Sequence, residues 1–212
     1  MVFFNHATRQ MTVKIVYYGP GLGGKTTNLS AIHAKTAPEA RGEMVSLNTE
    51  TDRTLFFDLL PMDLGVVAGY RARLQLYTVP GQVFYDSTRK LVLKGVDGVV
   101  FVVDSQTAMR EACRDSLENL RENVAGLGLD RTEVRLIADP GVAAQGIGVF
   151  ETLQAITQAA LARVEAQLTE ALPKPMPAPD LRTRPLGDLD LGLPTLELDP
   201  PPPPAEEDFS YL

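Results

Sequence analysis

Cysteine is almost absent from this 212-residue sequence, which contains only Cys113. A single cysteine excludes an internal disulfide and is typical of a protein from a reducing compartment. The longest apolar stretch, VDGVVFVVD, is far shorter than the ~20 residues that a membrane-spanning helix needs. The first ten residues, MVFFNHATRQ, lack the charged start and long apolar core of a secretory signal. We therefore expect a cytoplasmic protein with no transmembrane segment.

The chain also lacks any excess of positive charge. Its formal net charge is -7, and most of the acidic excess follows Leu172, where eight Asp and Glu accompany three Lys and Arg. The preceding 172 residues are nearly neutral, with a net charge of -2. Nucleic-acid-binding surfaces are built from clustered Lys and Arg, so we expect neither part to bind nucleic acid.

Aromatic residues are rare in the last 40 residues, where proline is abundant. Eleven prolines fall in residues 173–212, five of them consecutive at 200–204. Such a segment cannot bury enough apolar surface to offset its ordering entropy. We therefore expect a globular domain at 1–172 and a disordered, acidic, partly polyproline II tail at 173–212. Two interpretations of the tail stay open: a solvated segment without a specific role, or a docking segment that uses LGDLDLGLPTLELD and DFSYL.

Short apolar strands alternate with helical patterns in residues 1–172. Strands are expected at 13–18, 54–60, 70–79, 98–104 and 134–138, and helices at 26–35, 107–126 and about 149–172. The turn PMDLG at 61–65 is expected to join two strands as a hairpin, with Leu74 and Leu76 on one face of the second strand. The run GVVFVVD is apolar throughout, as in a central parallel strand. The pattern predicts an α/β fold, a mostly parallel sheet with helices on both faces.

The segment YGPGLGGKTT follows the first of these strands and opens the first helix. Residues 19–26 match G-x-x-x-x-G-K-[ST], in which glycines let backbone N–H groups turn towards phosphate oxygens and the helix adds its positive end. Lys25 would neutralise the β- and γ-phosphates, and the Thr26 hydroxyl would bind Mg²⁺. A merely glycine-rich turn is disfavoured, because a strand precedes the loop and a helix follows it. The candidate nucleotide-binding residues of the loop are Gly19, Gly21, Gly24, Lys25, Thr26 and Thr27.

Four stretches of the chain are familiar when taken together: KIVYYGPGLGGKTTNL, TETDRTLFFDLLP, LYTVPGQVFYDSTRKLVLKGVDGVVFVVDSQ and GIGVFETL. They closely resemble the MglA family of bacterial Ras-like GTPases of gliding motility and cell polarity. The resemblance covers residues 1 to about 170 with one interruption, and TVPGQ after a phosphate loop is quite specific to this group. It implies a Ras-like P-loop fold, GTP and GDP as ligands, Mg²⁺ as cofactor, and hydrolysis of GTP to GDP.

The resemblance also implies catalytic roles. Gly81 would offer its N–H to the γ-phosphate, and Gln82 would orient the attacking water. Arg53 would act as an arginine finger supplied in cis, spreading its charge over the transferring phosphoryl group. On their own, an arginine in a polar loop and a glutamine after Pro-Gly are usually just solvated, so both assignments depend on the resemblance.

A second hydroxyl ligand of Mg²⁺ is expected in the loop before the strand at 54–60. Thr54 is the first candidate, and Thr49 and Thr51 compete with it. Most P-loop proteins place an Asp where this chain has Thr78, to hold Mg²⁺ through water. The MglA-like group itself carries threonine there, so Thr78 is no sign of decay.

The guanine-reading motif of such proteins is missing. Neither N-K-x-D nor T-K-x-D occurs, and VRLIA is followed at once by DPGVAAQGIGVFETL. The resemblance implies that the reader, a helix and the last strand of the full fold are absent. Asp139 is the one carboxylate at the right strand end to substitute as a reader, although Pro140 and Gly141 divert the chain immediately.

Three interpretations of function follow. The chain is a small GTPase switch with impaired turnover or relaxed base selection, a pseudo-GTPase adaptor that keeps the switch surface for partners, or the product of a damaged gene. The intact phosphate loop with Arg53 and Gln82 favours the first. By resemblance, the expected partners are a roadblock-domain dimer that activates GTP hydrolysis, docking around residues 52–57 and 83–85, and other polarity or motility proteins. Recruitment by partners to the cell poles or the inner face of the membrane is a further hypothesis.

Overall fold

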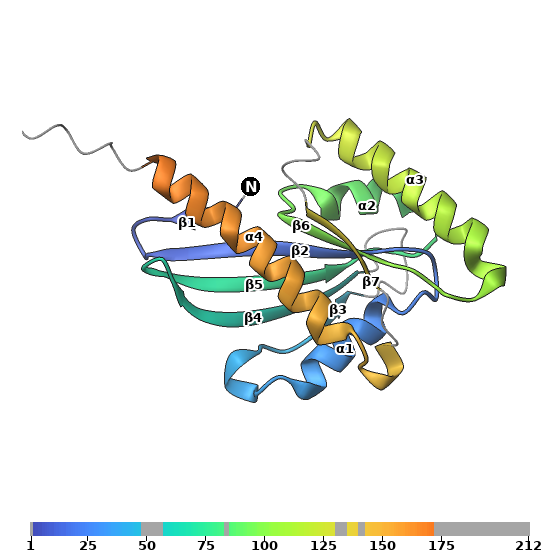
Figure 1. The fold of residues 1–212 in the computed structure, drawn as a ribbon, viewed down its shortest axis with the longest axis horizontal. Helices are drawn as coiled ribbons and strands as arrows, with labels where there is room; N and C mark the ends of the chain where they lie inside the picture. The colour runs from blue at the N-terminus through green and yellow to red at the C-terminus, as the bar shows by residue number, and fades with distance from the viewer. Residues whose placement is uncertain (1, 48–56, 83–84, 130–134, 140–142, 172–212) are drawn as a thin grey trace, which may run out of the picture. The chain divides into compact units, whose positions relative to one another are not determined.

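The computed structural model describes residues 2–47, 57–82, 85–129, 135–139 and 143–171 (Figure 1). Its strands are β1 (Phe3–Asn5), β2 (Gln10–Tyr18), β3 (Val45–Leu47), β4 (Phe57–Val67), β5 (Tyr70–Thr78), β6 (Gly98–Val102) and β7 (Arg135–Asp139). Its α-helices are α1 (Lys25–Lys35), α2 (Asp86–Leu93), α3 (Arg110–Gly126) and α4 (Val149–Ala171). Short 3-10 turns are η1 (Pro38–Ala40), η3 (Thr107–Met109) and η4 (Ala143–Gln145). The tail predicted at 173–212 lies outside the described residues.

The strands form one mixed sheet in the order β3-β4-β5-β2-β6-β7, with β1 added to β2. Strands β5, β2, β6 and β7 run parallel, whereas β3, β4 and β1 pair antiparallel with their neighbours. The register places Tyr17 of β2 beside Thr78 of β5, and Tyr18 beside Phe101 of β6. The carboxyl ends of β5, β2 and β6 therefore meet at one edge, where α/β proteins bind ligands.

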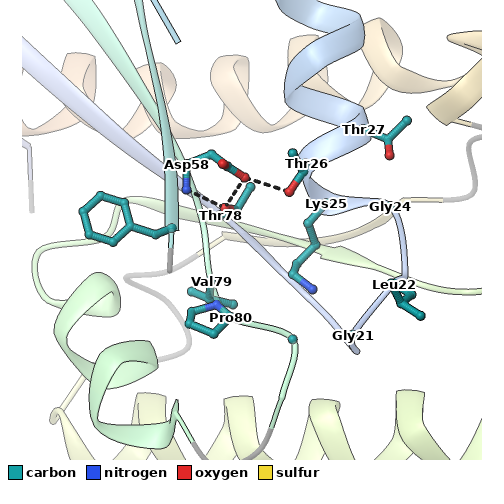
Figure 2. A pocket seen from close by; sticks show the side chains of 12 residues that line it. Gly21, Leu22, Gly24, Lys25, Thr26, Thr27, Asp58, Thr78, Val79 and Pro80 are labelled. Atoms are coloured by element: carbon teal, nitrogen blue, oxygen red, sulfur yellow. Dashed lines mark hydrogen bonds between the residues drawn. The ribbon is translucent and has the colours of Figure 1, made fainter. Parts of the chain in front are cut away.

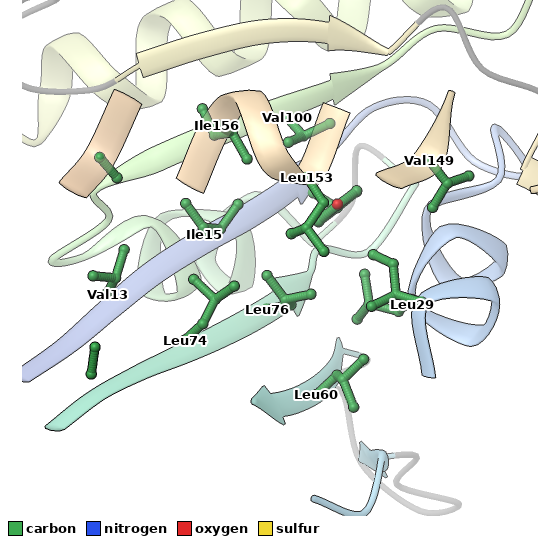
Figure 3. Packing of buried hydrophobic residues seen from close by; sticks show 14 of the residues in the cluster. Val13, Ile15, Leu29, Leu60, Leu74, Leu76, Val100, Val149, Leu153 and Ile156 are labelled. Carbon is green, nitrogen blue, oxygen red and sulfur yellow. The ribbon is translucent and has the colours of Figure 1, made fainter. Parts of the chain in front are cut away.

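Helices cover both faces of the sheet, as predicted. On one face, α1 and α4 pack against alternate residues of β2 and β5, as Figure 3 shows for Leu29, Leu153 and Ile156 around Ile15 and Leu76. On the other face, α2 and α3 contribute Val92, Leu93 and Leu120, which pack against the opposite side chains of β2 and β6. The β6 run is buried at every position because it is covered on both sides. No helix in the described part of the chain is long and apolar enough to cross a membrane.

The predicted hairpin turn at 61–65 is wrong. Those residues lie inside β4, which continues through Pro61 and a bulge at Asp63 and Gly65 before it ends at Val67. The turn is made by Ala68 and Gly69, whose φ angles of 49° and 82° are both left-handed. Two consecutive positive φ values define the type I′ turn that matches the twist of paired strands. Pro61 and Gly65 are therefore strand irregularities, and the turn lies at the next glycine.

The structure also contains three elements that the sequence reasoning missed: β1, β3 and α2. The helix α2 buries Thr88, Arg89, Val92 and Leu93, a spacing typical of one helical face. The predicted strand at 134–138 corresponds to β7, and the predicted last helix corresponds to α4. Among the described residues, β7 ends the sheet order, with no strand beyond it.

Candidate functional site

The loop between β2 and α1 needs glycine at two positions. Gly19 has φ 150°, and a Cβ there would lie 2.5 Å from the carbonyl oxygen of Val102. Gly24 has φ 92° and lies immediately before the first residue of α1. These backbone conformations are costly for residues with a side chain. They turn the chain so that the start of α1, which has no acidic residue in its first turn and no side-chain cap, faces a pocket.

The pocket has a volume of about 380 Å³ and lies between this loop and the end of β5 (Figure 2). Its walls are Gly21, Leu22, Gly24, Lys25, Thr26, Thr27, Phe57, Asp58, Thr78, Val79, Pro80 and Gly81. Six of the seven predicted nucleotide-binding residues thus line one cavity, and the seventh, Gly19, lies buried behind it. The loop from the first third of the chain and the TVPGQ segment are brought together as the motifs require.

Lys25 is the charged group of this pocket. Its side chain is only 7% exposed, and its ammonium donates to the carbonyl oxygens of Gly19 at 3.1 Å and Pro20 at 2.6 Å. Burial lowers the pKa of Lys25 to about 8, the Arg89 guanidinium adds to this, and the Asp58 carboxylate opposes it. The ammonium is thus held ready by main-chain oxygens in a place where a phosphate would be a much stronger partner.

Asp58 is a site residue that the sequence reasoning missed. Its carboxylate accepts hydrogen bonds from the hydroxyls of Thr26 at 2.7 Å, Thr78 at 2.9 Å and Ser46 at 2.7 Å. The Asp58 N–H donates to the Thr78 oxygen at 2.8 Å, which ties β4 to β5 at this point (Figure 2). The carboxylate that Thr78 lacks is therefore supplied by the neighbouring strand. Hydroxyl and carboxylate oxygens are the donors that Mg²⁺ prefers, so this set fits that ion.

Gly81 and Gln82 follow the pocket wall of β5. A Cβ on Gly81 would lie 2.2 Å from Cα of Gly21, so the two loops touch backbone to backbone. The carbonyl oxygens of Pro80 and Gly81 accept hydrogen bonds from Arg89 of α2. Gln82 is exposed and does not line the pocket.

Several predicted functional residues lie outside the described part of the chain. These are Arg53, Thr54, the competing Thr49 and Thr51, and residues 83–84 of the expected docking face. The side chain of Asp139, the candidate substitute reader, is outside it as well. Ala143 of η4 lies beside the phosphate loop, because a Cβ built on Gly24 would be 3.8 Å from Cβ of Ala143.

A comparison with curated proteins bears on this pocket. The chain is 48% identical over 192 residues to the mutual gliding-motility protein MglA of Myxococcus xanthus (strain DK1622), and the match covers 78% of this chain and 98% of the relative. The chain belongs to the MglA family. An MglA-family small GTPase has the Ras-like P-loop fold that the mixed sheet and its two helical layers display. No protein-family model matches the chain.

The extent of the match also bears on the missing segment. It spans 192 positions, whereas 78% of 212 residues is about 165, so the MglA relative has aligned positions without a counterpart here. An internal gap of this kind is what the absence of N-K-x-D requires. That the gap follows β7 stays a prediction from the sequence.

Proposed function

We propose that this MglA-family chain is a GTP-hydrolysing switch, of the kind that controls gliding motility and cell polarity, with weakened selection of the base. The observation that carries the proposal is the single cavity that joins the phosphate loop, Lys25 and the Thr26–Asp58–Thr78 cluster. Each part serves phosphate or Mg²⁺, and none of them reads a base.

In this proposal the pocket residues divide the work between phosphate and metal. The N–H groups at the start of α1 and the Lys25 ammonium bind the β- and γ-phosphates. Thr26 and the Asp58–Thr78 pair hold Mg²⁺, directly or through water, and Thr54 completes the set. The ion supplies positive charge to the phosphate oxygens. Gln82 orients the attacking water and Arg53 stabilises the charge of the transferring group.

The adaptor interpretation remains the second candidate because of the base side. The Asp of N-K-x-D would form a charge-assisted bond to guanine, and its loss costs roughly 1.5–3 kcal/mol, or about 10- to 100-fold in affinity. A pseudo-GTPase adaptor would tolerate that loss. It would not need Thr26, Asp58 and Thr78 to keep their mutual hydrogen bonds, or Lys25 to stay bonded to the loop carbonyls, which is why we favour the switch.

Partners complete the proposal. A roadblock-domain dimer that activates hydrolysis would dock on the face around residues 52–57 and 83–85. Other polarity or motility proteins would recruit the cytoplasmic switch to cell poles or to the inner face of the membrane, and the proline-rich tail would bind a further partner.

The test is a titration of the purified full chain with fluorescent GTP, GDP and ATP in Mg²⁺, followed by turnover of GTP. We expect the chain to bind GTP and GDP more tightly than ATP, by a smaller affinity ratio than an intact N-K-x-D site would give. We also expect slow hydrolysis of GTP. Gln82→Ala and Arg53→Ala should each slow hydrolysis at least tenfold, which is about 1.4 kcal/mol of transition-state stabilisation, with little change in binding.

Three other outcomes would count against the switch. Equal and weak binding of all three nucleotides would remove guanine selection. No binding by a chain that still melts cooperatively would leave the adaptor, and aggregation without a melting transition would indicate a damaged gene. Unchanged turnover in both variants would discard the roles of Gln82 and Arg53.

A further inference from the structure

Arg89 of α2 is the largest fully buried side chain of the described residues, with 0% exposure. Its Nε donates to the carbonyl oxygen of Pro80 at 2.9 Å, and its Nη2 donates to that of Gly81 at 2.8 Å. Its Nη1 donates to Asn119 of α3 at 2.7 Å. The guanidinium also lies over the Tyr18 ring, 5.1 Å from the centroid. One side chain therefore ties the pocket wall, the end of β2 and α3 together.

The positive charge of Arg89 has no direct carboxylate partner among the described residues. Compensation comes through two amides of α3, because Asn119 and Asn123 both donate to Asp86, at 2.8 and 2.9 Å. Burial alone would raise the pKa of Asp86, but hydrogen bonds from Lys90, Asn119 and Asn123 lower it to about 2. Asp86 is thus ionised at neutral pH and completes an Arg89–Asn119–Asp86 network.

Burial of an arginine costs desolvation free energy. Two main-chain carbonyls in an ordinary core would not need a charged donor. The position of these two carbonyls explains its presence. Pro80 and Gly81 line the candidate nucleotide pocket. A peptide unit is planar and trans, so the Pro80 C=O and the Gly81 N–H point in opposite directions. Holding the Pro80 oxygen towards α2 therefore turns the Gly81 N–H away from α2.

We propose that Arg89 is a positioning residue for the γ-phosphate: it fixes the Pro80–Gly81 peptide so that the Gly81 amide faces the terminal phosphate of a bound nucleoside triphosphate. The Asn119–Asn123–Asp86 network holds Arg89 in that geometry. The inference rests on the proposed function, since it assigns the part of the pocket that distinguishes a triphosphate from a diphosphate. It also makes α3 the helix that is mechanically linked to this distinction.

The test compares the affinity of the full chain for a non-hydrolysable GTP analogue with its affinity for GDP. In Arg89→Met the ratio should fall about tenfold, the loss expected for one misdirected hydrogen bond to a charged group. Affinity for GDP should change less than threefold, because the phosphate loop is untouched. In Arg89→Lys the ratio should lie between those of the wild type and Arg89→Met, because one ammonium can hold only one of the two carbonyls well. A ratio that stays at the wild-type value in a folded Arg89→Met protein overturns the proposal, and so does an equal loss for both nucleotides.

The matched control is Arg121→Met, which also replaces an arginine of the helical layer formed by α2 and α3. Arg121 is 56% exposed and, within the described part of the chain, bonds only to Glu118, so the ratio of this variant should match the wild type. If both Arg89 variants fail to fold, Asp86→Asn decides, because Asp86 is 37% exposed and its substitution keeps the shape of the network. Asp86→Asn should lower the ratio, as Arg89→Met does, but by a smaller factor. An unchanged ratio overturns the proposal. If the wild type binds neither guanine nucleotide, the proposed function and this inference are both overturned. If the wild type binds the analogue more tightly than GDP, the Arg89 variants test this inference separately from the proposed function.

Discussion

Burial in the pocket changes the protonation equilibrium of Lys25. It is buried against the carbonyls of Gly19 and Pro20, and its pKa lies near 8 instead of 10.5. Phosphate favours the ammonium form, because an opposite charge raises the pKa of a lysine. Nucleotide binding should therefore be coupled to proton uptake wherever the lysine of the free protein is partly neutral.

The sign of the coupling gives a pH prediction. Well below pH 8 the free protein already carries the ammonium, so binding takes up no proton at Lys25. At pH 8 binding of Mg·GDP should take up about half a proton, and from pH 8 to 9 the affinity should fall by up to about tenfold. Calorimetric titrations in two buffers of different ionisation enthalpy measure the uptake. Identical heats in both buffers at pH 8 would contradict the assignment of this pKa.

At the same scale, Asp58 shows where sequence reasoning reached its limit. The phosphate loop could be predicted because its residues are consecutive and the chemistry of each is known. Asp58 acts through its register with Thr78 across a hairpin, and the register depends on where the turn lies. A turn at 61–65 puts Asp58 opposite other residues, whereas the turn at Ala68 and Gly69 puts it opposite Thr78. The signal that could have found it was Gly69, which ends the apolar run of β4.

At the scale of elements, the phosphate loop and the β5–α2 connection act as one unit. They touch through Gly21 and Gly81, with no side chain between them. The contact brings the Gly81 peptide to the pocket wall, and Arg89 fixes it from behind. The spacing between the two connections is therefore set by the absence of a Cβ atom at Gly81, since a Cβ on Gly21 would come no closer than 3.7 Å to Gly81.

Gly81→Ala should consequently separate the two loops. Its Cβ would lie 2.2 Å from Cα and 2.6 Å from N of Gly21, and both are backbone atoms that cannot rotate away. We expect affinity for the GTP analogue to fall by more than about tenfold, or 1.4 kcal/mol, with a lower melting temperature. Gly126→Ala is the matched control, because nothing lies within 4 Å of a Cβ there. Equal affinities for the two variants would show that the loops can part without loss.

The elements differed in how well they could be predicted. β6 and α4 were found from long, consistent patterns, five buried residues in the strand and a helical stripe through Leu153, Ile156 and Ala160. β1 and β3 have three residues each, too few for any periodicity to emerge. Helix α2 is short, and one of its inward residues is Arg89, a type that sequence reasoning assigns to the surface.

At the scale of the whole molecule, the composition divides the chain near residue 172. The acidic, proline-rich residues 173–212 carry a net charge of -5 and have little to bury, whereas both hydrophobic clusters of the described residues come from residues before 172. A chain that ends at residue 172 should melt within about 3 °C of the full chain, which is under about 1 kcal/mol for a domain of this size. Its nucleotide affinities should be unchanged. A larger fall in the melting temperature on scanning calorimetry would mean that the tail stabilises the domain.

The fold class of the molecule was predictable, since alternating strands and helices leave few arrangements that bury all their apolar faces. For the part of the pocket that would contact the base, the sequence showed only that N-K-x-D is missing. A missing motif offers no side chains from which to predict contacts. The parts of the pocket that we propose to bind phosphate and Mg²⁺ adjoin β2, β4 and β5, and the segment expected to read the base would follow β7.

Among the described residues, β7 lies at the margin of the sheet, so a deletion beyond it would leave the rest of the sheet paired. Removing a strand beyond β7 interrupts none of the pairings that β5, β2 and β6 share, whereas removing β2 would split the sheet into two. The side of the pocket that would follow β7 should therefore tolerate deletion better than the side built on β2. Loss of a segment beyond β7 would remove the side proposed to read the base, and it would leave the strands that carry the proposed phosphate and Mg²⁺ residues paired as before.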